Sequence, residues 1–203
     1  MRPLNKFEEQ NLKVLTENSV SLTLIEPTKT GLGKGYMDAT KPVRSYLEKS
    51  GLHNYDLQGT GAKENGVKLE SVIHLGNNVE KVQASLYRPK AKGKGGDPRI
   101  WFSRLHHLIN PNDILALICF DSKIHVLNLT QLSVGQLLGS ALINPLKEFV
   151  EEVNITEKKV SNELLFKLRN ISKDGFVKSL VNADTGIGRN LEKMLGIELN
   201  SSK

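Results

Sequence analysis

The sequence predicts a mainly β fold with flanking helices and a helical C-terminal tail. Short segments between residues 19 and 129 alternate apolar and polar residues with a period of two, which is typical of half-buried strands. Clusters of Gly, Pro, Asn and Asp separate these segments and favour turns. Beyond Leu129 the apolar residues recur at helical spacing, so we expect the strands only before that point.

The composition is that of an ordinary soluble protein with room for one domain plus part of another. The chain has 203 residues, a net charge of +6 and 38% hydrophobic residues, and the positive charge suits an anionic partner. Its longest apolar run, residues 114–120, is far too short to cross a bilayer, and the first ten residues lack the apolar core of a signal peptide. We therefore expect a cytoplasmic protein without a membrane partner.

The same composition argues against disulfides and metal clusters. Cys119 is the single cysteine and lies inside the apolar run, where a buried, inert thiol is expected. The five histidines show no metal-ligand spacing with cysteines or carboxylates, so no metal site is predicted.

The first half of the chain begins with an amphipathic helix over residues 5–17, whose first turn contains acidic residues. Residues 19–25 alternate as a strand, and a short helix is expected over 41–50, with Pro42 near its start and Gly51 just past its end. Two further strands, 67–75 and 79–87, follow a loop.

The next elements are a strand around residues 100–102, a turn over 110–113 and a strand pair joined by a tight turn at 121–123. In the helical part, Ser133 is placed to cap a first helix. Asn144 and Pro145 open a second helix, and residues 154–174 and the last 19 residues also have helical spacing.

Two glycine-rich, basic segments interrupt the strands, EPTKTGLGKGYMDAT (residues 26–40) and YRPKAKGKGGDPRI (87–100). We call residues 26–36 of the first segment the first arm and residues 88–98 of the second segment the second arm. The second arm and the residues around it contain six cations, with Asp97 as the single acid, namely Arg88, Lys90, Lys92, Lys94, Arg99 and Arg104. A structural hairpin needs only about two to five loop residues. Cations this dense repel one another unless an anion lies between them, which indicates a nucleic-acid backbone, with a solvated loop as the alternative.

One catalytic pattern offers a second alternative. Asp113 with Asp121 and Lys123 loosely matches the arrangement with which many nucleases hold magnesium. In such sites the second acid and the lysine lie within a strand, on one face. Here Asp121 stands where the apolar run breaks, so we expect a hairpin tip rather than a self-contained magnesium nuclease.

The order of elements and the two arms over residues 19–130 resemble the DNA-binding pseudobarrel of plant B-three transcription factors and of the EcoRII effector domain. The motifs are TKTGLGKGY in the first arm and the acid-x-Arg-Ile run from Asp97 in the second. The resemblance implies a seven-stranded open barrel whose arms grip the major groove of duplex DNA. The positions that it assigns to DNA contact are Lys29, Thr30, Lys34, Tyr36, Arg88, Lys90, Lys92, Lys94, Asp97 and Arg99, and we add Arg104 from the same basic segment.

The chemistry of these side chains fits that role independently. Arginine can bind guanine O6 and N7 together, and a carboxylate can accept from cytosine N4. Asp97 is therefore a candidate for base readout, or else a loop aspartate before Pro98. The lysines are expected to contact phosphates, which set affinity and register.

Residues 185–196, TGIGRNLEKMLG, are similar to the opening motif of the MvaI, BcnI and MutH endonucleases. Glu192 occupies the place of a glutamate that belongs to their active-site cluster. In those enzymes the metal-binding Asp and a Glu-x-Lys follow downstream, whereas this sequence ends at Lys203. The resemblance implies that Mg²⁺ serves a nuclease domain that is only begun here, and that DNA binding needs no cofactor.

Together, the two resemblances predict a DNA-binding pseudobarrel domain over residues 1–153 and a helical linker with a truncated nuclease start over 154–203. The chain would be the N-terminal part of a bacterial EcoRII/MvaI-type, type IIE restriction endonuclease. We expect it to be a monomer that binds a CCWGG-type duplex site and does not cleave it. The alternative partner is RNA or the ribosome, but the 5% aromatic content argues against single-strand stacking platforms.

Overall fold

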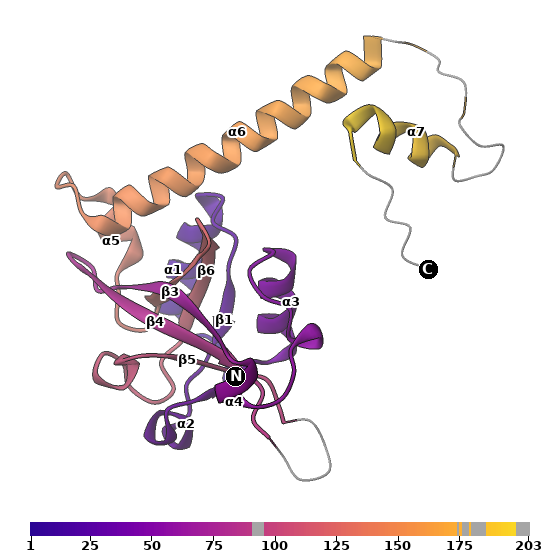
Figure 1. The fold of residues 1–203 in the computed structure, drawn as a ribbon. Helices are drawn as coiled ribbons and strands as arrows, with labels where there is room; N and C mark the ends of the chain where they lie inside the picture. The colour runs from indigo at the N-terminus through magenta and orange to yellow at the C-terminus, as the bar shows by residue number, and fades with distance from the viewer. Residues whose placement is uncertain (91–95, 174, 176–178, 180–185, 198–203) are drawn as a thin grey trace. The chain divides into compact units, whose positions relative to one another are not determined.

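The computed structural model describes residues 1–90, 96–173, 175, 179 and 186–197 (Figure 1). It contains two compact units, Met1–Asn154 and Ile155–Lys203. The first unit contains the sheet and the two arms.

Seven strands form one mixed sheet with the shape of an open half-barrel (Figure 1). The strands are β1 Thr23–Ile25, β2 Met37–Asp38, β3 Val67–His74, β4 Val79–Tyr87, β5 Arg99–Phe102, β6 Leu115–Phe120 and β7 Lys123–Asn128. Their order is β1-β6-β7-β3-β4-β5-β2, and only β3 and β7 pair in parallel. Because β1 and β2 lie at opposite edges, the first arm connects the two edges of the sheet. The predicted strands after residue 67 are confirmed, whereas β1 begins only at Thr23.

The described residues also form seven α-helices and two 3₁₀ turns. The helices are α1 Lys6–Glu17, α2 Lys29–Lys34, α3 Lys41–Lys49, α4 Ala62–Asn65, α5 Val134–Gly139, α6 Pro145–Lys173 and α7 Gly186–Leu195, with 3₁₀ turns η1 Tyr55–Leu57 and η2 Leu105–His107. The predicted helices α1 and α3 are confirmed. The helical segments predicted on either side of Asn154 form one continuous helix, α6, of 29 residues.

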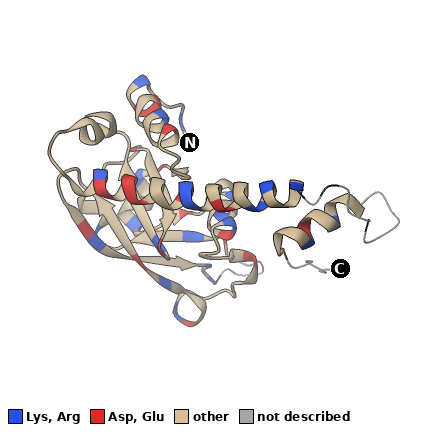
Figure 2. Ribbon diagram, turned by 90° about the horizontal axis from the view of Figure 1, so that it is seen from above, with Lys and Arg blue, Asp and Glu red and all other residues tan. Residues whose placement is uncertain are grey.

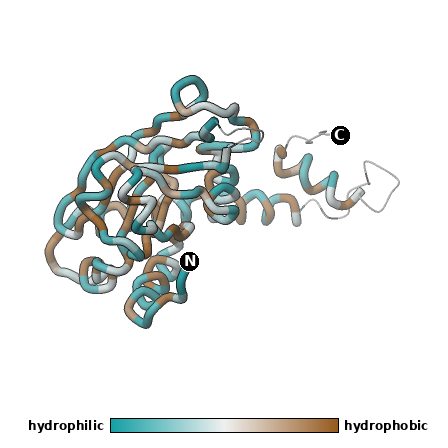
Figure 3. Tube along the Cα trace, turned by 90° about the horizontal axis from the view of Figure 1, so that it is seen from below, coloured by the Kyte–Doolittle hydropathy of each residue, from teal (hydrophilic) through white to brown (hydrophobic). Residues whose placement is uncertain are grey.

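The sheet is buried on both faces where β6 runs. Leu115 and Leu117 point into the inner core together with Val43 of α3. Ala116 and Ile118 point the other way, into the core formed with α1, α5 and the first part of α6. A strand with two buried faces reads as a continuous apolar run, whereas hydrophobic and hydrophilic positions alternate along the more exposed strands (Figure 3).

Of the two predicted helix caps, the one at Asn144 forms and the one at Ser133 does not, and α1 has a cap that was not predicted. Asn5 forms a capping box with Glu8 at α1, and the side chain of Asn144 accepts from Lys147 N at the start of α6. Ser133 stands before α5 but its side chain makes no cap hydrogen bond. Asn11 of α1 accepts from Val134 N instead, because packing brings the two helices together.

The first arm differs from the irregular finger that its turn residues predicted. It contains the helix α2, whose N-terminus is capped by Thr28 Oγ1 accepting from Gly31 N at 3.0 Å. Gly35 ends α2 in the left-handed conformation, with φ +67°. Lys29, Thr30 and Lys34 are therefore presented from a helical turn.

Candidate nucleic-acid interface

Both arms join the sheet at the same strand pair, β2 with β5. Met37 pairs with Ile100 and Asp38 with Arg99, and by extension of this register Tyr36 faces Trp101. The first arm ends at Tyr36, opposite Trp101, and the second ends at Pro98, so the two arms join opposite ends of this antiparallel pair. Their attachment points are three residues apart along β5, or about 10 Å at about 3.4 Å per residue. In Figure 1, α2 and the described stem of the second arm both lie below the sheet.

The first arm presents exposed polar groups. Lys29, Thr30 and Lys34 are exposed, and Tyr36 is half-buried. Within the part of the chain that the structure describes, neither lysine forms an ion pair with an acidic group. These two ammonium groups are therefore available to an anionic ligand.

The second arm has a closed stem. Arg88 Nε donates to Gly96 O at 3.2 Å, and Lys90 Nζ lies 2.7 Å from Glu64 Oε1 of α4. Gly96 packs so closely on Pro89 that an added Cβ would lie 2.1 Å from the Pro89 carbonyl oxygen. Lys92 and Lys94 lie outside the described residues, and Asp97 is exposed.

Acidic residues from other parts of the fold neutralise part of the positive charge that the sequence predicted around the second arm. Lys90 is paired with Glu64, Arg99 with Asp38 and Arg104 with Glu80. Acidic and basic residues are accordingly interspersed over the strands in Figure 2 rather than separated onto faces of one sign. Charge repulsion alone therefore does not require an anion at these three cations.

Arg104 does not belong to the second arm. It follows the far end of β5, has a φ of +64°, and pairs with Glu80 at the start of β4. It directly precedes η2, which contacts α2. Arg104 is thus on the side of the first arm, because the four residues of β5 separate it from the second.

The structure brings Tyr36 of the first arm together with Arg99, the residue that follows the second arm. Arg99 Cζ lies 3.9 Å from the centre of the Tyr36 ring, and Arg99 Nε lies 4.0 Å from Asp38 Oδ1. Asp38 was not among the predicted site residues. The only sequence signal for it is its position two residues after Tyr36, on the same face of a strand.

Trp101 lies on the outer face of β5 with Arg99, opposite Ile100 and Phe102. It is half-buried, packs against Gly35 and stacks with His106 at a ring distance of 6.2 Å. The alternation in residues 99–102 predicts this face.

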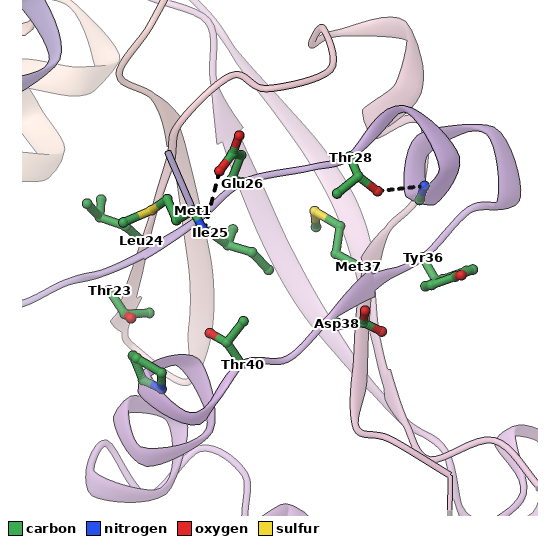
Figure 4. Close-up of a pocket in the computed structure, with 12 residues that line it drawn as sticks. Met1, Thr23, Leu24, Ile25, Glu26, Thr28, Tyr36, Met37, Asp38 and Thr40 are labelled. Atoms are coloured by element: carbon green, nitrogen blue, oxygen red, sulfur yellow. Dashed lines mark hydrogen bonds and ion pairs between the residues drawn. The ribbon is translucent and has the colours of Figure 1, made fainter. Parts of the chain in front are cut away.

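A pocket of about 450 Å³ lies in the opening between the two sheet edges (Figure 4). Thr23 and Ile25 of β1 line one side, and Met37 and Asp38 of β2 line the other. Its lining is mostly apolar, and Glu26 is engaged by the backbone N of Arg2 at 2.7 Å. This arrangement resembles an unclosed barrel seam and has no set of groups suited to catalysis.

The proposed magnesium triad is not assembled. Asp121 and Ser122 have φ angles of +48° and +57°, which makes them the two central residues of a hairpin turn between β6 and β7. Asp113 precedes the opposite end of β6, eight residues away, or about 25 Å at strand rise. Two carboxylates so far apart cannot share a metal ion, so this alternative site is wrong.

No other cluster of three or more His, Cys, Asp or Glu residues in the described ranges could hold a metal ion. Glu192 is exposed on α7, which ends at Gly196 with a φ of +75°. Thr185, which begins the predicted motif, lies outside the described residues. One carboxylate does not make a magnesium site, so Glu192 by itself fits no metal-dependent step.

Comparison with known proteins gives one match. Residues 165–203, about a fifth of the chain, match the MvaI/BcnI restriction endonuclease family, and this segment includes α7 and the C-terminal part of α6. No curated protein and no solved structure matches the chain. The matched segment is thus similar to part of a family of restriction endonucleases. Among the described helices, none is long and apolar enough to span a membrane.

Proposed function

We propose that this chain recognises duplex DNA for a restriction endonuclease, with the half-barrel of the first unit as a DNA-binding pseudobarrel. The observation that supports this most directly is that both basic arms join one strand pair, β2 with β5, at its two ends, about 10 Å apart along β5. The family match at residues 165–203 supplies the link to DNA hydrolysis.

The side chains divide into two roles. Lys29 and Lys34 are exposed cations on α2 that bind phosphates and set affinity. Asp97 at the end of the second arm and Arg99 at the start of β5 read base edges, which carry the direct sequence information of a duplex. The target is a short site of the CCWGG type, bound by a monomer.

Cleavage is not assigned to the 203 residues themselves. Within the described residues Asp113 and Asp121 are too far apart to share a metal ion, and Glu192 is a single carboxylate. Incubation of the chain with plasmid and Mg²⁺ should leave the plasmid intact, and nicking that Asp121→Ala abolishes would restore the magnesium alternative.

RNA remains the competing ligand, and two contacts argue against it. Base stacking on single strands needs open aromatic faces. Here the guanidinium of Arg99 covers the Tyr36 ring, and Trp101 packs against Gly35 and His106. Competition of a single-stranded RNA against duplex DNA separates the two ligands.

The test is selection of binding sites from a randomised duplex library, followed by affinity measurements at several salt concentrations. We expect the selected site to bind at least about a thousandfold more tightly than scrambled duplexes. Asp97→Ala should relax discrimination at one base pair by about 1–3 kcal/mol. Lys34→Ala should weaken every duplex alike and reduce the salt slope by about one. Equal affinity for all duplexes would remove the proposal.

A further inference from the structure

Arg99 differs from the other described cations near the second arm in how it is held. Arg88 and Lys90 use their donors on partners at 3.2 Å and 2.7 Å, and Arg104 is ion-paired with Glu80. The closest acidic oxygen to Arg99 Nε is Asp38 Oδ1 at 4.0 Å, which is beyond hydrogen-bonding distance. Its Nε is buried and has no acceptor among the residues that the structure describes, while the side chain as a whole is 29% exposed.

The ring of Tyr36 supports the guanidinium of Arg99 from one side. A guanidinium 3.9 Å from a ring centre lies within the range of a cation–π contact. Such a contact uses the face of the cation, so its N–H groups can still donate hydrogen bonds to a ligand. Asp38 adds attraction along the same pair of strands, since it faces Arg99 directly in the register. A long, flexible side chain is thereby restricted before any ligand arrives.

The backbone of the first arm fixes the position of Tyr36. Tyr36 N donates to Gly31 O at 3.0 Å, and this bond closes the end of α2. Gly35, which precedes Tyr36, has a φ of +67° and packs against the indole of Trp101. Figure 4 shows Tyr36 and Asp38 on either side of Met37, where α2 leads into β2.

We propose that Tyr36 and Asp38 are positioning residues that hold Arg99 in a preorganised geometry, so that the first arm sets the discrimination achieved at the second. This rests on the proposed function, because Arg99 is the base-reading group. It reassigns Tyr36 from a DNA contact to a support for one. The benefit is thermodynamic, since a side chain already restricted loses less freedom when it binds.

The geometry is tested first without DNA. In a ¹H–¹⁵N NMR spectrum, the Nε–Hε signal of Arg99 should be displaced from those of the other arginines by the ring current of Tyr36. Tyr36→Phe keeps the ring and should keep the displacement, whereas Tyr36→Leu should abolish it. An unchanged Arg99 signal in Tyr36→Leu would overturn the proposal.

The functional test is a double-mutant cycle on DNA binding, with the selected duplex and a scrambled duplex as probes. Tyr36→Leu and Asp38→Asn should each lower the ratio of specific to scrambled affinity by roughly three- to tenfold, as expected for a cation–π or comparable contact. Neither should change the ratio further in an Arg99→Ala background. Tyr36→Phe is the matched control and should stay within about twofold of wild type.

The outcomes separate the inference from the proposed function. Equal effects of Tyr36→Leu with and without Arg99, or a loss that is the same on scrambled DNA, would make Tyr36 a direct or structural contributor and overturn the inference alone. A wild-type chain without sequence preference would overturn both. If Tyr36→Leu fails to fold, Asp38→Asn still tests the inference. The Asp38 side chain is 68% exposed, so this variant should fold normally.

Discussion

Asp113, a buried carboxylate just before β6, holds the turn that starts this strand. Its Oδ2 accepts from Asn128 Nδ2 at 2.7 Å, Gln131 Nε2 at 2.6 Å and Asn110 N at 2.8 Å. Three donors converging on one oxygen explain why an acid is needed there. Its role is to join the start of β6 to the end of β7.

We expect Asp113→Ala to lower the free energy of unfolding by about 1–3 kcal/mol, because it leaves buried donors without an acceptor. Denaturant unfolding measures this loss. DNA affinity, measured on the folded variant, should equal that of wild type. A stable Asp113→Ala chain that binds DNA poorly would contradict the structural role.

At the scale of elements, α2 determines how the first arm presents its two lysines. The helix has six residues and ends in a tight turn, so its geometry depends on glycine at specific positions. A Cβ on Gly31 would lie 2.5 Å from the Tyr36 carbonyl oxygen, whereas a Cβ on Gly33 would meet nothing within 4 Å. Of these two glycines in one helix, Gly33 can therefore accept a side chain and Gly31 cannot.

Gly31→Ala should distort the end of α2, weaken DNA binding and reduce stability, because the added Cβ would lie 2.5 Å from the Tyr36 carbonyl oxygen and the backbone must shift to relieve the clash. Gly33→Ala is the matched control and should be neutral or stabilise the protein by up to about 1 kcal/mol, as expected for Gly to Ala in a helix. Thermal unfolding and duplex affinity of both variants test this. Equal behaviour of the two variants would mean that α2 does not constrain the arm.

Helix α6 changes character along its length. Leu146, Phe149, Val150 and Val153 are buried in the core of the first unit. Ile155, Val160 and Leu164 are exposed by about half or more of their surface, at 68%, 57% and 48%. The change falls at the boundary between the two compact units, after Asn154.

At the scale of the whole first unit, a buried histidine pair couples stability to pH. His74 of β3 and His125 of β7 lie 3.1 Å apart between ring nitrogens, and the Phe149 ring stacks on His125 at 4.0 Å. Burial lowers the pKa of His74 to about 3 and that of His125 to about 4. The positive charge of Lys123 adds to the lowering at His125, and Asp121 opposes it.

A lowered histidine pKa means that the fold favours the neutral ring, so its stabilising contribution is complete above the unfolded pKa of about 6.5. As the pH falls below 6.5, the histidines bind protons in the unfolded chain but stay neutral in the native state. Stability should then decrease by up to about 1.4 kcal/mol per pH unit for each histidine, down to the native values.

Urea unfolding between pH 7.5 and 4.5 measures this slope. His125→Leu should make it shallower, because one titrating group is removed from the pair. A free energy of unfolding that stays constant between pH 7 and 5 would show that the pair opens to solvent. The hydrogen bond from Arg2 holds the pKa of Glu8 at about 2. The stabilising contribution of Glu8 is therefore complete above its unfolded pKa of about 4.5 and is lost only as the pH falls below that value.

The sequence by itself determined the elements whose signals lie within a few residues. Alternation placed β3 and β4, the apolar run and its break at Asp121 placed β6, the hairpin turn and β7, and Asn144 with Pro145 placed the start of α6. These signals are local because backbone geometry, capping bonds and turn conformations involve neighbouring residues. The basic composition of the arms was equally visible.

Only the tertiary structure decided which residues meet. The partners of the cations, Asp38 for Arg99, Glu64 for Lys90 and Glu80 for Arg104, come from other strands and helices. Asn11 caps α5 from a distant helix, and the length of β6 separates Asp113 from Asp121. Such contacts depend on strand order and register, which no local pattern specifies, because each is settled by how the whole sheet packs.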